Sequence, residues 1–212
     1  AAVTMTVGNM LALSQSNIKR LLGYSTIAQA GYILVGLASV PANQVGATFA
    51  GAGPQGVMYY LAGYVFTNLA VFFAVIAITA RTNDDSIKGL NGMLKRSPLL
   101  AGLLVFGLLS LLGMPPTVGF MAKVVVFGSA VNANLTWLAL IGVVNTVIAA
   151  YYYLRVIRAI VFEDPADEST FSADKPVLVA AGVAAVGAGE FGLAPFLLLE
   201  FAESALSIIP GL

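Results

Sequence analysis

One lysine of this sequence stands apart from the other charged residues and is a candidate for proton chemistry. Lys123 lies in the run 97–154, which holds no other charged residue. Burial disfavours a charged ammonium group, and so does the positive end of a helix that begins just before it. We therefore expect Lys123 to load and release a proton. The alternative is a lysine that reaches a membrane interface or is held by a fixed acid.

The residues before Lys123 predict an interrupted helix. Two adjacent prolines remove backbone donors and clash with the preceding turn, whereas proline suits the first turn of a new helix. We predict two half-helices that are separated by a break near Pro115. The residues of this predicted break are Gly113, Pro115, Pro116 and Gly119. Broken helices at membrane depth occur where backbone is buried in protein or lines a wet cavity.

A second lysine and two polar stripes are further candidates. Lys19 precedes an apolar segment, where it serves either proton transfer or membrane topology. The stripes either line a hydrated path or join helices by hydrogen bonds. The polar path that we expect comprises Tyr24, Ser25, Gln29, Tyr64 and Asn68. For Glu190, which we place past the bilayer midplane, we favour a packing or partner-contact role, and for 151–153 an interfacial aromatic belt.

The composition places these residues in a membrane protein. Of the 212 residues 59% are hydrophobic and 9% are charged, against about 25% charged in soluble domains. The run 21–80 holds no charge at all. No soluble fold of this size buries so much apolar surface, so we predict an all-α integral membrane protein.

The absence of two residue types limits the chemistry of the chain. It contains no His and no Cys, which excludes cysteine-ligated Fe–S clusters, histidine-ligated haem and the usual zinc sites. Catalysis by Ser-His-Asp or Cys-His is excluded as well. The ten basic and ten acidic residues give no net charge, so nothing indicates a nucleic-acid partner.

A bilayer core requires about 20 apolar residues in a helix. On that measure the sequence predicts five complete spans after a truncated one, within one domain over 1–212. The predicted spans are 1–13 (truncated), 22–40, 57–80, 99–131 (broken), 135–161 and 177–199. Because the chain opens inside an apolar run, we expect it to be a fragment with more protein upstream.

The basic residues predict the orientation. Nine of the ten fall in loops on one side, and the tenth is Lys123. By the positive-inside rule that side is the cytoplasm, so the C-terminus faces out, as do Asn43 and Asn134. We expect the acidic stretch 163–174 to be a solvated loop.

Two stretches carry a resemblance to a known family. They are GNMLALSQSNIKRLLGYSTIAQAGYILVGL and GLNGMLKRSPLLAGLLVFGLLSLLGMPPTVGFMAKVVVF, and the second is followed by NTVIAAYYYLRVI. The first is similar to the antiporter-like membrane subunits. Together they resemble the N-subunit family of proton-pumping NADH:quinone oxidoreductase, respiratory complex I. The resemblance covers nearly all of 7–161.

The resemblance implies an antiporter-like helix bundle of two inverted repeats, each with a broken helix, of which this chain is the C-terminal half. It matches Lys123 to the lysine of the broken helix on the family's central hydrophilic axis, and Lys19 to the lysine that opens the preceding motif. The family's intramembrane Glu and further lysines lie upstream. Gln29 stands where many members carry His.

The function that the resemblance implies is proton translocation within a quinone-reducing translocase of the bacterial inner membrane. The chain itself is expected to hold no cofactor, with NADH, FMN, Fe–S clusters and quinone in other subunits. Its expected partners are other membrane-arm subunits and the lipid bilayer. Two alternatives stay open: a cation/proton antiporter or membrane-bound hydrogenase subunit of the same superfamily, and a structural membrane spacer.

Overall fold

The computed structural model describes residues 1–39 and 53–206, and this part of the chain is built of helices. Four of them, α2, α3, α7 and α8, are long and apolar enough to cross a membrane. The prediction of an all-α integral membrane fold is therefore confirmed. The elements are α1 (Ala2–Leu13), α2 (Ile18–Ala38), α3 (Gly53–Thr82), a 3₁₀ turn (Lys88–Leu90), α4 (Met93–Arg96), α5 (Pro98–Leu112), α6 (Val118–Asn132), α7 (Thr136–Phe162), α8 (Lys175–Leu193) and α9 (Pro195–Leu206).

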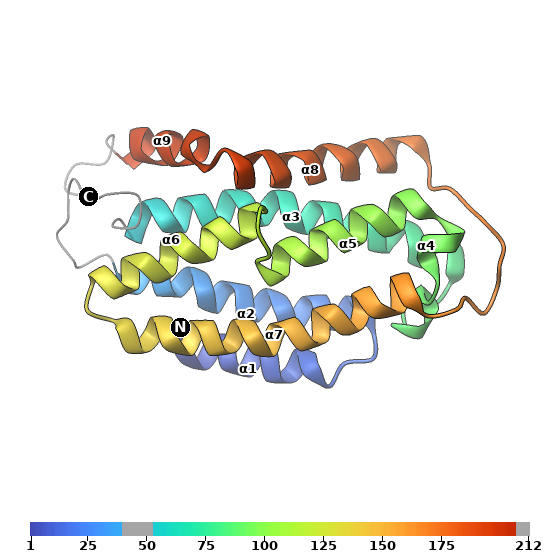
Figure 1. Cartoon of the computed structure of the whole chain (residues 1–212), viewed down its shortest axis with the longest axis horizontal. Coiled ribbons are helices and arrows are strands. Elements are labelled where there is room, and N and C mark those ends of the chain that lie inside the picture. Colours follow the sequence, from blue (N-terminus) through green and yellow to red (C-terminus); the bar gives the residue numbers. More distant parts are fainter. Residues whose placement is uncertain (40–52, 207–212) are drawn as a thin grey trace.

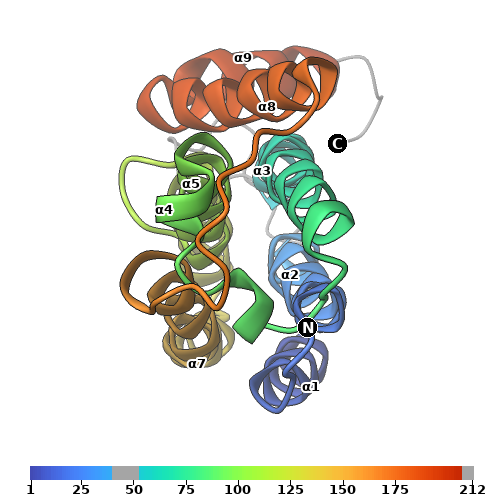
Figure 2. The ribbon, with the colours of Figure 1, turned by 90° about the vertical axis from the view of Figure 1, so that its right-hand side faces the viewer.

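The helices lie side by side along the long axis of the molecule (Figure 1). In the end view of Figure 2, α1, α2 and α3 form one row, α5 and α7 face it, and α8 lies across the end beside α3. The pair α5–α6 packs against α2, α3, α7 and α8. The break between α5 and α6 is therefore enclosed by helices from both halves of the chain.

The predicted discontinuous helix is present. Helix α5 ends at Leu112, and Gly113 adopts a left-handed conformation with φ 88°, which glycine tolerates without steric cost. The chain then passes through a cis Pro115–Pro116 peptide, and α6 begins at Val118. The two half-helices follow one another along the long axis, with the break near its middle (Figure 1).

The expectation of one continuous last span over 177–199 is wrong. Helix α8 ends at Leu193 and α9 begins at Pro195. Proline has no backbone N–H, so Pro195 cannot donate to the carbonyl of Phe191 four residues earlier. The hydroxyl of Tyr59 in α3 donates to that carbonyl instead, at 2.6 Å.

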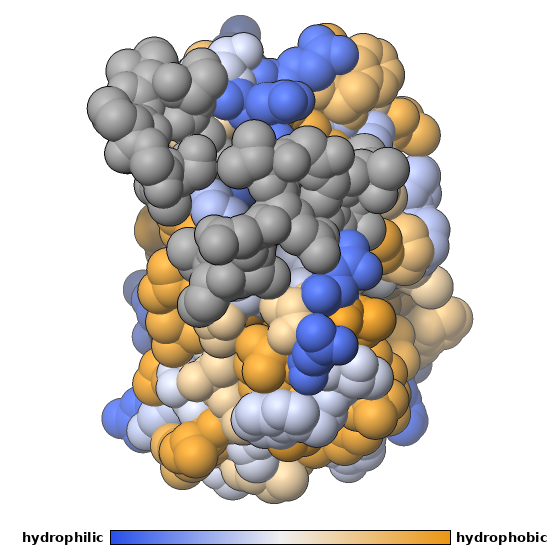
Figure 3. Space-filling view, turned by 90° about the vertical axis from the view of Figure 1, so that its left-hand side faces the viewer, coloured by the Kyte–Doolittle hydropathy of each residue, from blue (hydrophilic) through white to orange (hydrophobic). Residues whose placement is uncertain are grey.

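The outer faces of the helices carry apolar side chains. On α7, Leu140 is 62% exposed and Val147 is 68% exposed. Figure 3 looks onto the end opposite the basic loops, where hydrophobic side chains line the flanks and hydrophilic ones form separate patches. Exposed apolar faces of this kind suit contact with lipid or with other membrane helices.

The acidic loop 163–174 crosses the basic end of the bundle (Figure 2). The expectation of a merely solvated loop missed its ion pairs, because those partners come from other parts of the chain. The backbone N–H of Phe171 donates to the Arg96 carbonyl at 3.1 Å. The ion pairs are Lys95–Asp164 (2.8 Å), Arg158–Glu163 (3.1 Å), Arg96–Asp167 (3.2 Å) and Arg81–Asp174 (3.3 Å).

Candidate functional site at the helix break

Lys123 occupies the second turn of α6 and is 5% exposed. Its side chain reaches back across the break to the end of α5. Nζ donates to the carbonyls of Leu111 (3.0 Å) and Leu112 (2.6 Å) and lies 5.1 Å from the centre of the Tyr32 ring. A helix end leaves four carbonyls without helical partners, and the break therefore supplies acceptors for this lysine.

The other two terminal carbonyls of α5 are satisfied by the break itself. The backbone N–H of Gly113 donates to Leu109 and Ser110, and that of Met114 donates to Leu109. Only Leu111 and Leu112 remain for side chains. The position of Lys123 thus follows from the same left-handed turn that interrupts the helix.

The ammonium group of Lys123 faces backbone carbonyls at a helix end and an aromatic ring. Among the ion pairs of residues 1–39 and 53–206, none involves Lys123. The expectation that the positive end of the second half-helix adds to the effect of burial was incomplete, since Nζ faces the C-terminal end of α5. That end carries the negative pole of the helix dipole and attracts a cation.

Gln29 in α2 shares an acceptor with Lys123. Its amide nitrogen donates to the Leu111 carbonyl at 3.1 Å and lies 3.4 Å from the hydroxyl of Tyr153. Its amide oxygen accepts a hydrogen bond from the hydroxyl of Tyr60 at 2.5 Å. Gln29 therefore connects the lysine's carbonyl to hydroxyl groups on α3 and α7.

A small cavity lies beside this contact. Its volume is about 10 Å³, roughly the least that admits one water molecule. Across it the hydroxyls of Thr67 and Ser110 lie 2.9 Å apart. A side chain at Gly119 would meet the Ser110 carbonyl, so this glycine allows the half-helices to approach closely. The lining residues are Gln29, Tyr60, Gly63, Tyr64, Thr67, Ser110, Leu111, Gly119 and Ala122.

A second hydrogen-bond cluster lies behind Tyr32, and the sequence reasoning missed its centre. Asn9 in α1 donates to the Tyr32 hydroxyl (3.2 Å) and to the side-chain oxygen of Asn145 (3.0 Å). It accepts from the Tyr152 hydroxyl at 2.9 Å. Asn9 is fully buried. The sequence feature that could have indicated this cluster is a single asparagine within an apolar helix.

Seven of the buried polar residues form one layer across the bundle. In α1, α2, α3 and α7 they lie between two apolar clusters, one toward each end of the molecule, and at the broken helix they lie where α5 of one cluster meets α6 of the other. In α1, for example, Asn9 lies between Met5 of one cluster and Ala12 of the other. We call this set the polar layer; its members are Asn9, Ser25, Gln29, Thr67, Ser110, Lys123 and Asn145.

The predicted path residues lie at different distances from this layer. Gln29 and Tyr64 line the cavity, and the Tyr64 hydroxyl donates to Thr26 at 2.9 Å. Ser25 is buried and donates to a carbonyl of its own helix. Tyr24 is half-buried against the cluster at the basic end. Asn68 is half-buried beside Thr67, and among the described residues it has no hydrogen-bond partner.

Lys19 lies far from Lys123. It occupies the first turn of α2, is 44% exposed, and pairs with Asp85 at 2.6 Å. Gln29 follows it by roughly 15 Å along the helix, at 1.5 Å per residue. The structure therefore brings Lys123 and Gln29 together and leaves Lys19 at the basic end.

The expected aromatic belt over 151–153 is wrong for two of its three members. Tyr152 and Tyr153 are fully buried, with ring centres 4.4 Å apart, and only Tyr151 is exposed. No group of three or more acidic side chains in the described ranges is close enough to hold a metal ion.

Comparison with known proteins shows to which family this chain belongs. Residues 1–149 match the family described as NADH:quinone oxidoreductase/Mrp antiporter, transmembrane. The chain belongs to this family. The chain is 41% identical over 209 residues to NADH-quinone oxidoreductase subunit N of Dehalococcoides mccartyi. That alignment covers 99% of this chain and 42% of that protein. The chain is also 41% identical to the subunit N of Trichlorobacter lovleyi, covering 99% of this chain and 42% of that protein.

Solved structures give the same result. A chain of respiratory complex I from Thermus thermophilus is 30% identical, with a TM-score of 0.77, covering 94% of this chain and 43% of that one. A chain of the Mrp complex from Dietzia sp. has a TM-score of 0.85 at 23% identity, covering 97% of this chain and 45% of that one, which shows the shared fold. The predicted antiporter-like bundle and the resemblance to subunit N are confirmed. The chain spans about two fifths of the length of these curated relatives.

Proposed function

We propose that this chain is part of a proton-translocating membrane subunit of an NADH:quinone oxidoreductase, in which Lys123 loads and releases a proton. One observation carries the proposal. A buried lysine at a helix break donates to two carbonyls, Leu111 and Leu112, and takes part in no ion pair among the described residues. Intramembrane ionisable residues are rare and usually functional. Carbonyl acceptors allow the group to change charge without leaving a carboxylate unpaired.

The polar layer supplies the proposed route away from Lys123. Leu111 joins Lys123 to Gln29, and Gln29 joins the hydroxyls of Tyr60 and Tyr153. The Leu111 carbonyl and the Gln29 amide hold the lysine and the hydroxyls in place, and the proton itself would pass through the hydroxyls and the one water that the neighbouring cavity admits. Lys19, at the end of α2, is the second proton-handling residue of this proposal.

Electron transfer belongs to other subunits in this proposal. Fe–S clusters would be bound by those subunits, since this chain offers no Cys or His ligands, and NADH, FMN and quinone would be bound there with them. Its partners would be other membrane-arm subunits and the lipid bilayer of a bacterial inner membrane. The basic end of the bundle would face the cytoplasm and the C-terminus would face out.

One other function has support. The likeness of fold to the Mrp complex from Dietzia sp. favours a cation/proton antiporter as the second candidate. The subunits that co-purify with the full-length protein separate the candidates, because a quinone-reducing complex must bring NADH-oxidising and Fe–S proteins with it. Co-purification of membrane antiporter subunits alone would contradict the first.

The experiment uses the full-length subunit in its complex, reconstituted in vesicles. Lys123→Ala should leave the complex assembled but reduce NADH-driven proton pumping by about tenfold or more, as expected for loss of a proton-transfer group. Lys95→Ala is the matched control, because that lysine is exposed and pairs only with the acidic loop. Normal pumping in assembled Lys123→Ala complexes would favour a structural spacer.

A further inference from the structure

Helix α8 presents one regular apolar face to the outside of the bundle. We call it the α8 stripe, and its members recur at alternating steps of four and three residues. This is the spacing of a helix that packs along another helix. The four apolar members are between 58% and 71% exposed. The stripe comprises Val179, Val183, Val186, Glu190 and Leu193.

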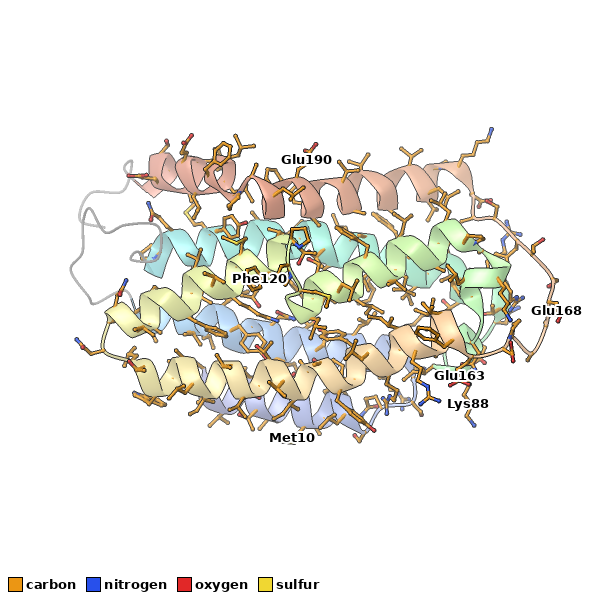
Figure 4. The ribbon with its side chains drawn as sticks, viewed as in Figure 1. Met10, Lys88, Phe120, Glu163, Glu168 and Glu190 are labelled. Carbon is orange, nitrogen blue, oxygen red and sulfur yellow. The ribbon has the colours of Figure 1, made fainter. Side chains whose placement is uncertain are left out.

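The one charged member of the stripe lies deep in the membrane. Glu190 is roughly 22 Å along α8 from Lys175, well inside a hydrocarbon core of about 30 Å. Figure 4 shows it on the outer side of α8, directed away from the bundle, at about the level of Phe120 beside the helix break. Glu190 thus faces outward at the depth of the polar layer.

Within residues 1–39 and 53–206, no side chain neutralises that carboxylate. The described ion pairs and hydrogen bonds between side chains do not include Glu190. A carboxylate that faces lipid at this depth costs several kcal/mol by typical scales. Such residues pair with another charge or with a polar group, and because none of the described residues is placed to do so, a neighbouring helix would supply the pairing group.

The surface around Glu190 fits a helix better than a lipid chain. A methyl group added to Gly182 would meet nothing within 4 Å, so the surface beside Val183 and Val186 is open and carries a small residue there. Small residues at such positions let a second backbone approach closely. The opposite face of α8 is already packed, with Gly192 against Pro116 and Gly187 against Phe66.

We propose that the α8 stripe is the contact surface for a transmembrane helix of another subunit, and that this helix places a lysine or arginine opposite Glu190. Charge complementarity selects this occupant over a lipid tail or a second copy of this chain, whose α8 stripe carries the same negative charge. The contact would place the partner's charge two residues from Gly192, which packs against the backbone of the helix break.

A photo-crosslinking residue at Val186 of the full-length subunit tests the occupant in native membranes. We expect a crosslink to a transmembrane segment of a different subunit, with a lysine or arginine within one helical turn of the crosslinked residue. Crosslinks only to lipid, only to the remainder of the same subunit, or only to a second copy of this chain would overturn the proposal. No transport is measured, so this outcome is independent of the proposed proton pathway.

Charge substitutions test the ion pair. Glu190→Gln keeps the shape of the side chain, and we expect it to lower retention of the subunit in the complex under mild detergent by about threefold. Glu190→Lys should lower it further and be rescued by an acidic residue at the crosslinked partner position. Glu203→Gln and Glu203→Lys, on the exposed face of α9, are the matched controls. Equal retention of the Glu190 and Glu203 variants would contradict the pair.

Discussion

At the scale of single residues, the break both creates the acceptors of Lys123 and limits their number. Gly113 turns the chain left-handed, so that its own N–H and that of Met114 return to Leu109 and Ser110. The carbonyls of Leu111 and Leu112 are then left to a side chain. A continuous helix would have used both carbonyls internally, and Lys123 would have had no acceptors there.

This dependence predicts that Gly113→Ala destabilises the protein. A left-handed alanine costs about 1–2 kcal/mol, and its methyl group would lie 3.0 Å from Cδ and Nζ of Lys123. Gly102→Ala is the control, because nothing lies within 4 Å of that added methyl group and alanine favours the helix. Thermal unfolding of the full-length protein should show a lower Tm for Gly113→Ala only. Equal Tm values would contradict this role of Gly113.

At the scale of elements, the sequence predicts the break because Pro115 and Pro116 act locally on the backbone. The second interruption was missed because the apolar composition continues through Pro195. The tyrosine run was misplaced for a similar reason. Successive helical residues point about 100° apart, so Tyr151 faces out while Tyr152 and Tyr153 face in. In an apolar helix, composition does not distinguish the lipid face from the buried face.

The docking of the acidic loop 163–174 could not be predicted from the sequence, because it depends on tertiary contacts with residues such as Lys95 and Arg96. Lys95 donates a hydrogen bond to Asp164 and lowers the pKa of that carboxyl. The hydroxyl and backbone N–H of Ser169 lower the pKa of Asp167, and Arg96 adds to this effect. A carboxyl whose pKa is lowered by folding stabilises the docked loop at neutral pH. That stabilisation is lost as the pH falls through the lowered pKa.

We therefore predict that the loop detaches in acid. A spin label at Thr170→Cys should be immobilised near pH 7 and become mobile below the ordinary carboxyl pKa of 3.8. Asp167→Asn should raise its mobility already at neutral pH. A label at Ser14→Cys, in the turn after α1, serves as the control. If the label at position 170 is equally mobile at pH 7 and at a pH well below 3.8, the ion pairs do not hold the loop.

At the scale of the whole molecule, the loops that carry the basic residues gather at one end (Figure 1), and the polar layer lies between the two apolar clusters. This layer includes Lys123 and the centres of both hydrogen-bond clusters, Gln29 and Asn9. Residues far apart in the sequence, such as Asn9 and Asn145, meet in it. The sequence indicates which helices are polar, but their relative rotation and depth come only from packing.

The distribution of basic residues also predicts the orientation. The chain has no cysteine, so single cysteines can report sidedness. Asn134→Cys, in the turn between α6 and α7, should react with an impermeant maleimide from outside the cell. Lys88→Cys should react only from the cytoplasmic side. The reverse pattern would overturn the orientation. Asn43, the other outer position expected from the sequence, lies outside the described residues.

We propose centrally that Lys123 releases its proton and does not only carry a fixed positive charge. Lys123→Arg separates the two, because a guanidinium still donates to carbonyls but does not give up its proton at accessible pH. The decisive measurement is the number of protons pumped per electron by the intact complex in vesicles, with assembly checked on the same sample. We predict that assembled Lys123→Arg complexes pump fewer protons per electron than the wild type. An unchanged ratio in assembled Lys123→Arg complexes would contradict the account.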